Sequence, residues 1–297
     1  MKNNSKSDDT FDKKFNSLVA RKNIFAAISK YSIEEYFGNV SQKEVRNLIN
    51  SNDDSDTIPI NQTVNSKGAK IEYDSIADVS LPKDLQTEDF KEIGIRINLE
   101  MQRNSSPGYN LHKREVYYAS RMIDDMLEST SNSKEYDKIK PVYSIWIILT
   151  KNEKLKDTVV KYNLSSNDYM AKFDKNGQVS YINIYKIYID SRYAEKEVSD
   201  LAPDIVKLIY GLFKNNKVLL KDLEIEYNKN DEERIGSMVE ERSLIYEDGF
   251  ADGETKSLIR GFKKGYISKD AVVELLDITD ERFEVLLKEY SEKKNNQ

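Results

Sequence analysis

The chain of 297 residues contains no cysteine and only one histidine, His112. The lack of cysteine excludes disulfides, thiolate zinc sites, iron–sulfur clusters and cysteine nucleophiles. A single histidine excludes multi-histidine metal sites, and a serine–histidine–aspartate triad would have to pass through His112. The groups that remain for demanding chemistry are carboxylates with a divalent cation, lysine, tyrosine and arginine.

Long apolar segments are also missing. The longest runs from Val142 to Leu149, far below the ~20 residues that a membrane-spanning helix needs. The polar N-terminus contains no apolar segment of a secretory signal. We therefore expect a soluble, cytoplasmic protein without a membrane partner.

Proline is scarce, with five residues, whereas 19 tyrosines and 10 phenylalanines fit a folded protein. The formal net charge is −6, which argues against general affinity for nucleic acid. However, residues 222–254 alone hold 12 acidic and 3 basic residues. The rest of the chain is therefore nearly neutral and can form a local basic groove.

Apolar spacing predicts an α/β domain with a mixed sheet over residues 10–221, between a disordered polar tail (1–9) and a charged helical region (222–297). Ser41, Ser268 and Thr279 are expected to cap helices at their N-termini. The predicted elements are helices over 12–37, 41–50, 110–129 and 202–215 and strands over 71–81, 93–102, 142–149 and 179–190, with a polar linker over 51–69.

The C-terminal region is acidic but has an apolar stripe at helical spacing. The stripe comprises Ile235, Met238, Val239, Ile245 and Tyr246. It is too small to form a core alone, so we expect it to pack on the α/β domain or on a partner chain. We predict a role in self-association or regulation for this region.

Two carboxylates are predicted to meet across the first two strands. An antiparallel turn centred near Thr87 places Asp74 opposite Glu100 and Asp78 opposite Arg96, with Gln102 on the same face as Glu100. Like charges opposite each other repel, and a divalent cation would offset the repulsion. Asp78 is the second choice as a metal ligand. The alternative is an ordinary hairpin with a solvated acidic face.

The same region resembles the PD-(D/E)XK nuclease superfamily. It is most similar to the bacterial PD-(D/E)XK nuclease family transposases, or recombination-promoting nucleases. The resemblance covers most of the chain and rests on YD (73–74), INLEMQ (97–102), PGYNLHKREVYYASRMI (107–123) and YDKIKPVYSIWI (136–147), with support from residues 21–36 and from GFADGE (249–254). It implies a restriction-endonuclease-like core.

The resemblance also implies a metal-dependent site. Asp74 and Glu100 match its metal-binding carboxylates, and the backbone carbonyl of Met101 is a further ligand of Mg²⁺ or Mn²⁺. Gln102 stands where the superfamily usually has lysine. It can orient a water molecule but adds no positive charge. The catalytic residues implied are therefore Asp74, Glu100 and Gln102.

Four further residues are candidates for supporting the site or binding the substrate, namely Glu35, Arg114, Tyr118 and Arg121. Glu35 matches an acidic position on the first helix of the family. Basic residues on the helix after the second strand can grip phosphate, or they can form a solvated helix face. His112 fits a surface position near the start of that helix.

The leading hypothesis is a metal-dependent DNA endonuclease that acts in recombination, mobile-element biology or phage defence. The alternative is a non-catalytic interaction or regulatory protein that retains the nuclease fold.

Overall fold

The computed structural model describes residues 4–50, 56–58, 62–64, 70–85, 94–127, 136, 139–163, 180–238, 257–275, 280, 283–284 and 287. Contacts divide the chain into two compact units. One spans Asp9–Val239 and the other comprises Met1–Asp8 with Glu240–Gln297. Within the described ranges, no helix combines the length and the apolar character needed to cross a membrane.

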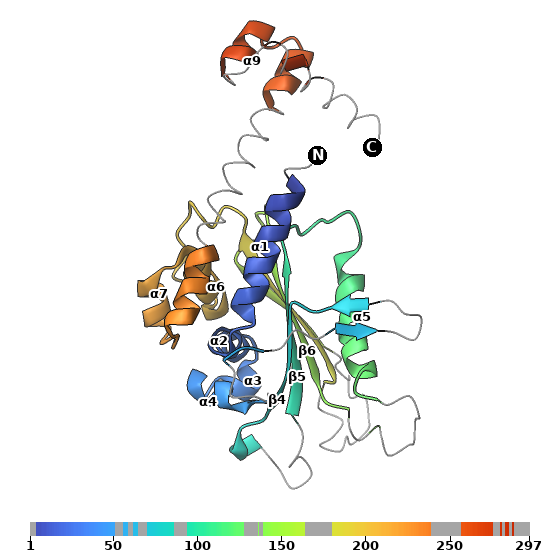
Figure 1. Cartoon of the computed structure of the whole chain (residues 1–297), viewed down its shortest axis with the longest axis vertical. Coiled ribbons are helices and arrows are strands. Elements are labelled where there is room, and N and C mark those ends of the chain that lie inside the picture. The colour runs from blue at the N-terminus through green and yellow to red at the C-terminus, as the bar shows by residue number, and fades with distance from the viewer. Residues whose placement is uncertain are drawn as a thin grey trace. The chain divides into compact units, whose positions relative to one another are not determined.

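A six-stranded mixed sheet forms the centre of the larger unit (Figure 1). Its strand order is β1-β4-β5-β6-β8-β7, in which β5, β6 and β8 are parallel and the other pairs are antiparallel. The six strands are β1 (Ile49–Asn50), β4 (Ser75–Ser80), β5 (Gly94–Gln102), β6 (Val142–Thr150), β7 (Thr158–Asn163) and β8 (Ile182–Asp190). The mixed sheet and α/β class predicted from the sequence are confirmed.

Helices cover both faces of this sheet. One face carries α5 (Leu111–Asp124), and helices of the opposite layer lie across the sheet from it (Figure 1). Further helices are α1 (Asn4–Val19), which enters this unit at Asp9, α2 (Lys22–Ser32), α3 (Glu34–Phe37), α4 (Gln42–Leu48), α6 (Asp204–Lys214) and α7 (Lys217–Asp222), with a short 3-10 turn, η1 (Lys83–Leu85). Residues 229–238 are also helical. The Ser41 hydroxyl accepts a hydrogen bond from the Glu44 N–H at 3.2 Å, so the predicted cap is present.

The predicted strand over 71–81 is broken. Residues Lys70–Glu72 form β3, which pairs with β2 (Gln62–Val64) in a separate two-stranded sheet, and β4 begins only at Ser75. Ile71 and Tyr73 consequently pack with Ile76 in the core cluster beneath α5, although the alternation predicted that Ile76 faces the other way. β2 also lies within the segment expected to be a linker.

The pairing of β4 with β5 has the predicted register. Asp78 pairs with Arg96 and Ser75 pairs with Leu99. The buried residues of β5 and β6 fill both layers, since Ile97 and Ile147 on one face and Trp146 and Ile148 on the other are all 0% exposed. This two-sided burial fixes the ends of β5 and β6, which carry the candidate site.

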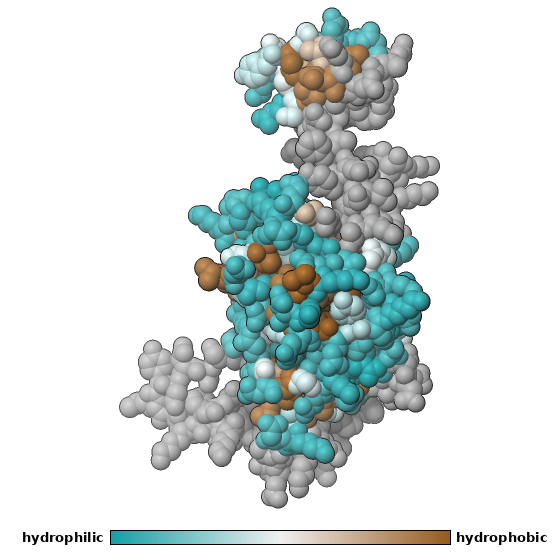
Figure 2. Space-filling model, turned by 90° about the vertical axis from the view of Figure 1, so that its left-hand side faces the viewer, coloured by the Kyte–Doolittle hydropathy of each residue, from teal (hydrophilic) through white to brown (hydrophobic). Residues whose placement is uncertain are grey.

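The smaller unit has its own apolar core. Ile259, Val272 and Phe283 are buried together there, and hydrophobic residues gather in this unit in Figure 2. Helix α9 (Lys269–Leu275) follows Ser268, whose hydroxyl accepts a hydrogen bond from the Ala271 N–H at 3.2 Å. The cap at Ser268 is therefore present, whereas Thr279 and the GFADGE segment lie outside the described residues.

On the side of the larger unit that Figure 2 presents, hydrophobic residues form only small patches in a mainly hydrophilic surface.

Candidate functional site

The candidate site begins where the ladder between β4 and β5 ends. Beyond the Ser75–Leu99 pair, side chains replace backbone groups as hydrogen-bond partners. The Asp74 Oδ2 atom accepts a hydrogen bond from the Met101 N–H at 2.8 Å. The Asp74 N–H in turn donates to Glu100 Oε1 at 3.3 Å. The bend at Asp74 thus brings the two predicted carboxylate residues together.

Glu100 is removed from water and lies beside a second acidic group. Its relative exposure is 2%. Burial raises the pKa of Glu100 well above 4.5, and the charge of Asp74 raises it further, whereas the positive charge of Arg114 opposes this rise. Glu100 is therefore harder to ionise than an exposed glutamate, and a metal cation beside the two carboxyl groups would oppose this effect.

Gln102 ends β5 on the same face as Glu100. Its Nε2 donates to the carbonyl of Asn104 at 3.1 Å, and its Oε1 accepts from Arg114 Nη1 at 3.3 Å. The amide is therefore oriented at both ends, and its oxygen is held by a cation.

Helix α5 places Arg114 and Tyr118 over this end of the sheet. Asn110 caps the helix, since its side-chain oxygen accepts a hydrogen bond from the Lys113 N–H at 3.1 Å. Arg114 Nη2 donates to the hydroxyl of Tyr118 at 3.1 Å, one helical turn away. Burial raises the pKa of Tyr118, and the charge of Glu100 adds to this effect, so Tyr118 remains a neutral phenol.

Asp78 is engaged elsewhere. Arg96 donates to its two carboxylate oxygens at 2.7 and 3.1 Å, and Lys140 Nζ lies 3.4 Å from Oδ2. Burial alone would raise the pKa of Asp78, but the hydrogen bonds and charge of Arg96, aided by Lys140, outweigh it and lower the pKa. This is the cross-strand ion pair that the predicted register implies.

Glu35 is not brought to the two carboxylates. Its Oε1 accepts hydrogen bonds from the hydroxyl groups of Tyr143 and Tyr185, at 3.2 and 2.6 Å. Tyr143 pairs with Ile97, so it belongs to the face of the sheet opposite Glu100. Glu35 consequently connects α3 to the face of the sheet that lies opposite Glu100.

Arg121 also lies apart from the pair. It forms ion pairs with Asp124 and Asp125 near the C-terminus of α5, the second at 3.0 Å. These ion pairs stabilise the last turn of α5, and Arg121 lies two helical turns from Arg114.

His112, whose side chain is 43% exposed, lies at the edge of a buried polar pair between α5 and β8. Its Nδ1 lies 3.0 Å from an oxygen of Glu115, and the same oxygen lies 2.7 Å from Lys186 Nζ. Glu115 and Lys186 are both buried, with 0% and 5% exposure. Lys186 and Glu100 flank Trp146 in neighbouring strands. The sequence carried no local signal of this pairing.

The donor set suits a hard divalent cation. Among the described side chains, no group of three or more histidine, cysteine, aspartate or glutamate residues is arranged to hold a metal ion. Asp74, Glu100 and the Met101 carbonyl supply oxygen atoms only. Mg²⁺ is commonly held by one or two carboxylates, and water and substrate phosphate complete its shell. The buried carboxyl group of Glu100 and the partly buried one of Asp74 fit such a cation, and a bound cation would favour their ionised forms.

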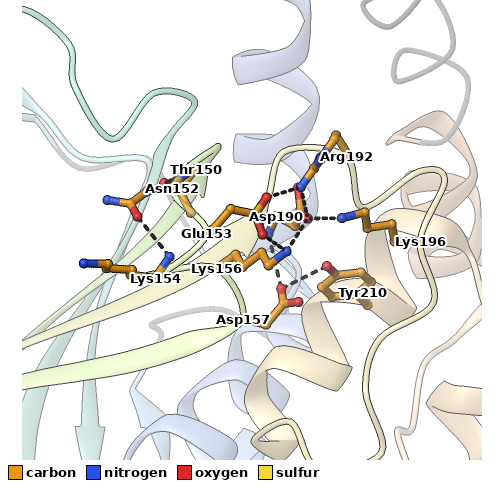
Figure 3. Close-up of polar contacts among 10 residues, drawn as sticks. All are labelled: Thr150, Asn152, Glu153, Lys154, Lys156, Asp157, Asp190, Arg192, Lys196 and Tyr210. Atoms are coloured by element: carbon orange, nitrogen blue, oxygen red, sulfur yellow. Dashed lines mark hydrogen bonds and ion pairs between the residues drawn. The ribbon is translucent and has the colours of Figure 1, made fainter.

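A second polar cluster lies at the ends of β6 and β8 (Figure 3). Asp190 is 1% exposed, and Arg192 and Lys196 each contact its Oδ2, at 3.1 and 3.2 Å. Burial would raise the pKa of Asp190, but the hydrogen bonds of Arg192 and Lys196 lower it to about 2. Asp157 accepts a hydrogen bond from the Tyr210 hydroxyl at 2.9 Å. Arg192 and Lys196 are paired with a carboxylate here, so we assign the cluster a structural role in stabilising the surrounding loops.

Two aromatic residues at the site were not predicted. The hydroxyl of Tyr109 accepts a hydrogen bond from Arg114 Nη1 at 2.8 Å. The guanidinium carbon of Arg114 lies 5.2 Å from the ring centroid of Trp146, which pairs with Glu100 across β5 and β6. The sequence indicates that Trp146 is buried, because it lies in the apolar run 142–149 after α5. Its partner in β5 follows only from the parallel register between β5 and β6.

One protein family matches part of the chain. The sequence model described as PD-(D/E)XK nuclease family transposase matches residues 84–212, a segment that includes Glu100, Gln102 and Arg114 but not Asp74. No curated protein and no solved structure gives a significant match. The family match confirms the resemblance and, with the mixed sheet, the PD-(D/E)XK-like core. It supports a nuclease-type function, for which DNA is the substrate that the family suggests.

Proposed function

Because residues 84–212 match PD-(D/E)XK nuclease family transposases, we propose that the protein is a metal-dependent DNA endonuclease. The observation that carries this proposal is the contact between Asp74 and Glu100 at the end of the β4–β5 ladder. It places two oxygen-donor side chains beside the last residues of β5.

In this proposal Asp74, Glu100 and the Met101 carbonyl would hold Mg²⁺ or Mn²⁺. When bound, the cation would supply Lewis-acid polarisation of a phosphoryl oxygen and would lower the pKa of a water molecule. Asp74 is oriented by the Met101 N–H. The oxygen of Gln102 is held by Arg114, and its amide group can position a water molecule. Tyr118 supports Arg114 through its hydroxyl group.

The proposed biological setting is recombination, mobile-element biology or phage defence. The proposed location is the cytoplasm, and the proposed partner is DNA. We further propose that the charged C-terminal helices serve self-association or regulation and take no part in the chemical step.

The decisive experiment is nicking of supercoiled plasmid DNA in Mg²⁺, in Mn²⁺ and in EDTA. We expect cleavage only with a divalent cation, and a loss of about 100-fold or more in Asp74→Ala and Glu100→Ala, because each removes part of the cation site. Glu72→Ala is the matched control, since Glu72 is an exposed carboxylate two residues from Asp74. It should cleave like the wild type.

Calorimetric titration with Mn²⁺ separates this proposal from a non-catalytic protein with a nuclease fold. Wild type and Glu72→Ala should bind the ion, and Asp74→Ala should not. Equal Mn²⁺ binding in all three proteins, or cleavage that survives in Glu100→Ala, would refute the site.

A further inference from the structure

Arg114 is a cation whose direct polar partners at the site are all neutral. Its guanidinium group donates to the amide oxygen of Gln102 at 3.3 Å and to the hydroxyl groups of Tyr109 at 2.8 Å and Tyr118 at 3.1 Å. Other arginines of the larger unit, such as Arg192, contact carboxylates directly. Among the described residues, no carboxylate forms an ion pair with Arg114, so its positive charge is not cancelled by direct contact.

Two aromatic rings fix the position of this charge. The guanidinium carbon lies 5.0 Å from the ring centroid of Tyr118 and 5.2 Å from that of Trp146. Aromatic faces attract a cation without neutralising it. Because the planar guanidinium is held by two rings and three hydrogen bonds, little conformational freedom remains for it to lose when an anion binds.

The charge also lies close to the carboxylates. Trp146, against which Arg114 lies, pairs with Glu100 across β5 and β6. Gln102, which contacts Arg114, is neutral and adds no positive charge where negative charge develops on a phosphoryl group under attack.

We propose that Arg114 binds the scissile phosphate of DNA and supplies the positive charge that Gln102 lacks. The inference rests on the proposed function, because it assigns a role at the same site. Arginine suits this role, since its fork of N–H donors matches two oxygen atoms of a phosphate.

The test compares Arg114→Met with Arg192→Met, which removes the same charge from the carboxylate-paired cluster of Figure 3. The first readout is the affinity for a short fluorescein-labelled DNA duplex in Ca²⁺, measured by anisotropy. The second is the cleavage rate in Mg²⁺. We expect Arg114→Met to bind DNA more weakly and to cleave about 100-fold or more slowly, while Arg192→Met stays close to the wild type.

Relocation of the charge gives a second, independent arm. The double variant Gln102→Lys/Arg114→Met returns a cation to the adjacent side chain, and we expect it to recover part of the cleavage that Arg114→Met loses. The chain has one tryptophan, Trp146, which contacts Arg114. Its emission spectrum reports whether each variant keeps the fold around this residue, and in the wild type it should change on addition of DNA.

The outcomes separate the two proposals. If the wild type binds DNA through Arg114 but does not cleave it with any divalent cation, the endonuclease proposal fails and the phosphate-binding role of Arg114 stands. If Arg114→Met keeps its native Trp146 emission and matches Arg192→Met in both DNA affinity and cleavage, the role of Arg114 is refuted. Lack of DNA binding by the wild type also refutes it.

Discussion

At the scale of single residues, the raised pKa of Glu100 couples the site to the stability of the fold. A carboxyl group whose folded-state pKa is raised stabilises the protein fully below its unfolded pKa, and this contribution is lost as the pH rises through the folded value. In EDTA, the free energy of unfolding of the wild type should therefore fall relative to Glu100→Gln above pH 4.5. The fall should be about 1.4 kcal/mol per pH unit between the unfolded-state pKa and the raised folded-state pKa of Glu100.

Urea unfolding of both proteins over a pH series measures this difference. Added Mn²⁺ should reduce it at neutral pH, because a cation favours the ionised carboxylate. Parallel pH profiles in EDTA would contradict the electrostatic description of Glu100.

Asp78 gives the opposite pH dependence. Its pKa is lowered by Arg96 and Lys140, so its stabilising contribution is present above the unfolded pKa and is lost as the pH falls through the folded value. Asp78→Asn should destabilise the protein at pH 7 by about 1–2 kcal/mol, because it removes the negative charge from the partly buried ion pair with Arg96. Mn²⁺ affinity should remain unchanged, and its loss in calorimetry would make Asp78 a metal ligand.

At the scale of helices and strands, the buried pair of Glu115 and Lys186 connects α5 to β8. Lys186→Met would leave the Glu115 carboxylate buried without its main cation, which should destabilise the protein by about 3–5 kcal/mol. Glu115→Gln/Lys186→Met should lose less, because no unpaired charge remains. Lys154→Met, at an exposed lysine, is the control. Urea unfolding of this set together with the single variant Glu115→Gln gives the coupling energy between the two side chains.

The sequence predicts most of the strands and helices that hold the site, because their apolar spacing reflects burial on one or both faces. It does not predict β7, an edge strand whose last three residues are exposed and which lacks a continuous apolar run. It also misses the break at Asp74, since the alternation continues through it. The bend is maintained by hydrogen bonds to Glu100 and Met101, which are distant in sequence.

The candidate site divides in the same way. The contact of Asp74 with Glu100 follows from an antiparallel register that the turn position sets. The stacking of Arg114 on Trp146 depends on a parallel register between β5 and β6. That register joins segments on either side of a helix, and no local pattern encodes it.

At the scale of the whole molecule, the larger compact unit extends to Val239, beyond the position 221 expected from composition. Asp231 is 0% exposed and accepts hydrogen bonds from Arg21 Nε at 2.5 Å and Asn23 at 2.7 Å. Ile235 and Met238 of the predicted apolar stripe are buried as well. The carboxylate of Asp231 thus connects the acidic segment after residue 221 to the start of α2.

A chain that ends at Val239 should fold and keep both Mn²⁺ binding and the Trp146 emission of the full-length protein. A chain that ends at residue 221 should be markedly less stable, since Arg21 loses Asp231 and apolar groups become exposed. Thermal unfolding and light scattering of the three proteins test this. If the C-terminal helices mediate self-association, only the full-length chain should form oligomers. Loss of Mn²⁺ binding in a folded chain that ends at Val239 would place the C-terminal region in the metal site.

The bend at Asp74 also makes one amide proton a reporter of local motion. The Met101 N–H is held by a side chain instead of by a carbonyl of the adjacent strand. Its exchange with solvent deuterium therefore requires only that the carboxylate rotate away, whereas neighbouring amides of β5 require the strands to separate. The proton of Met101 should exchange faster than those of Ile97 and Leu99, and a cation that immobilises Asp74 should slow it.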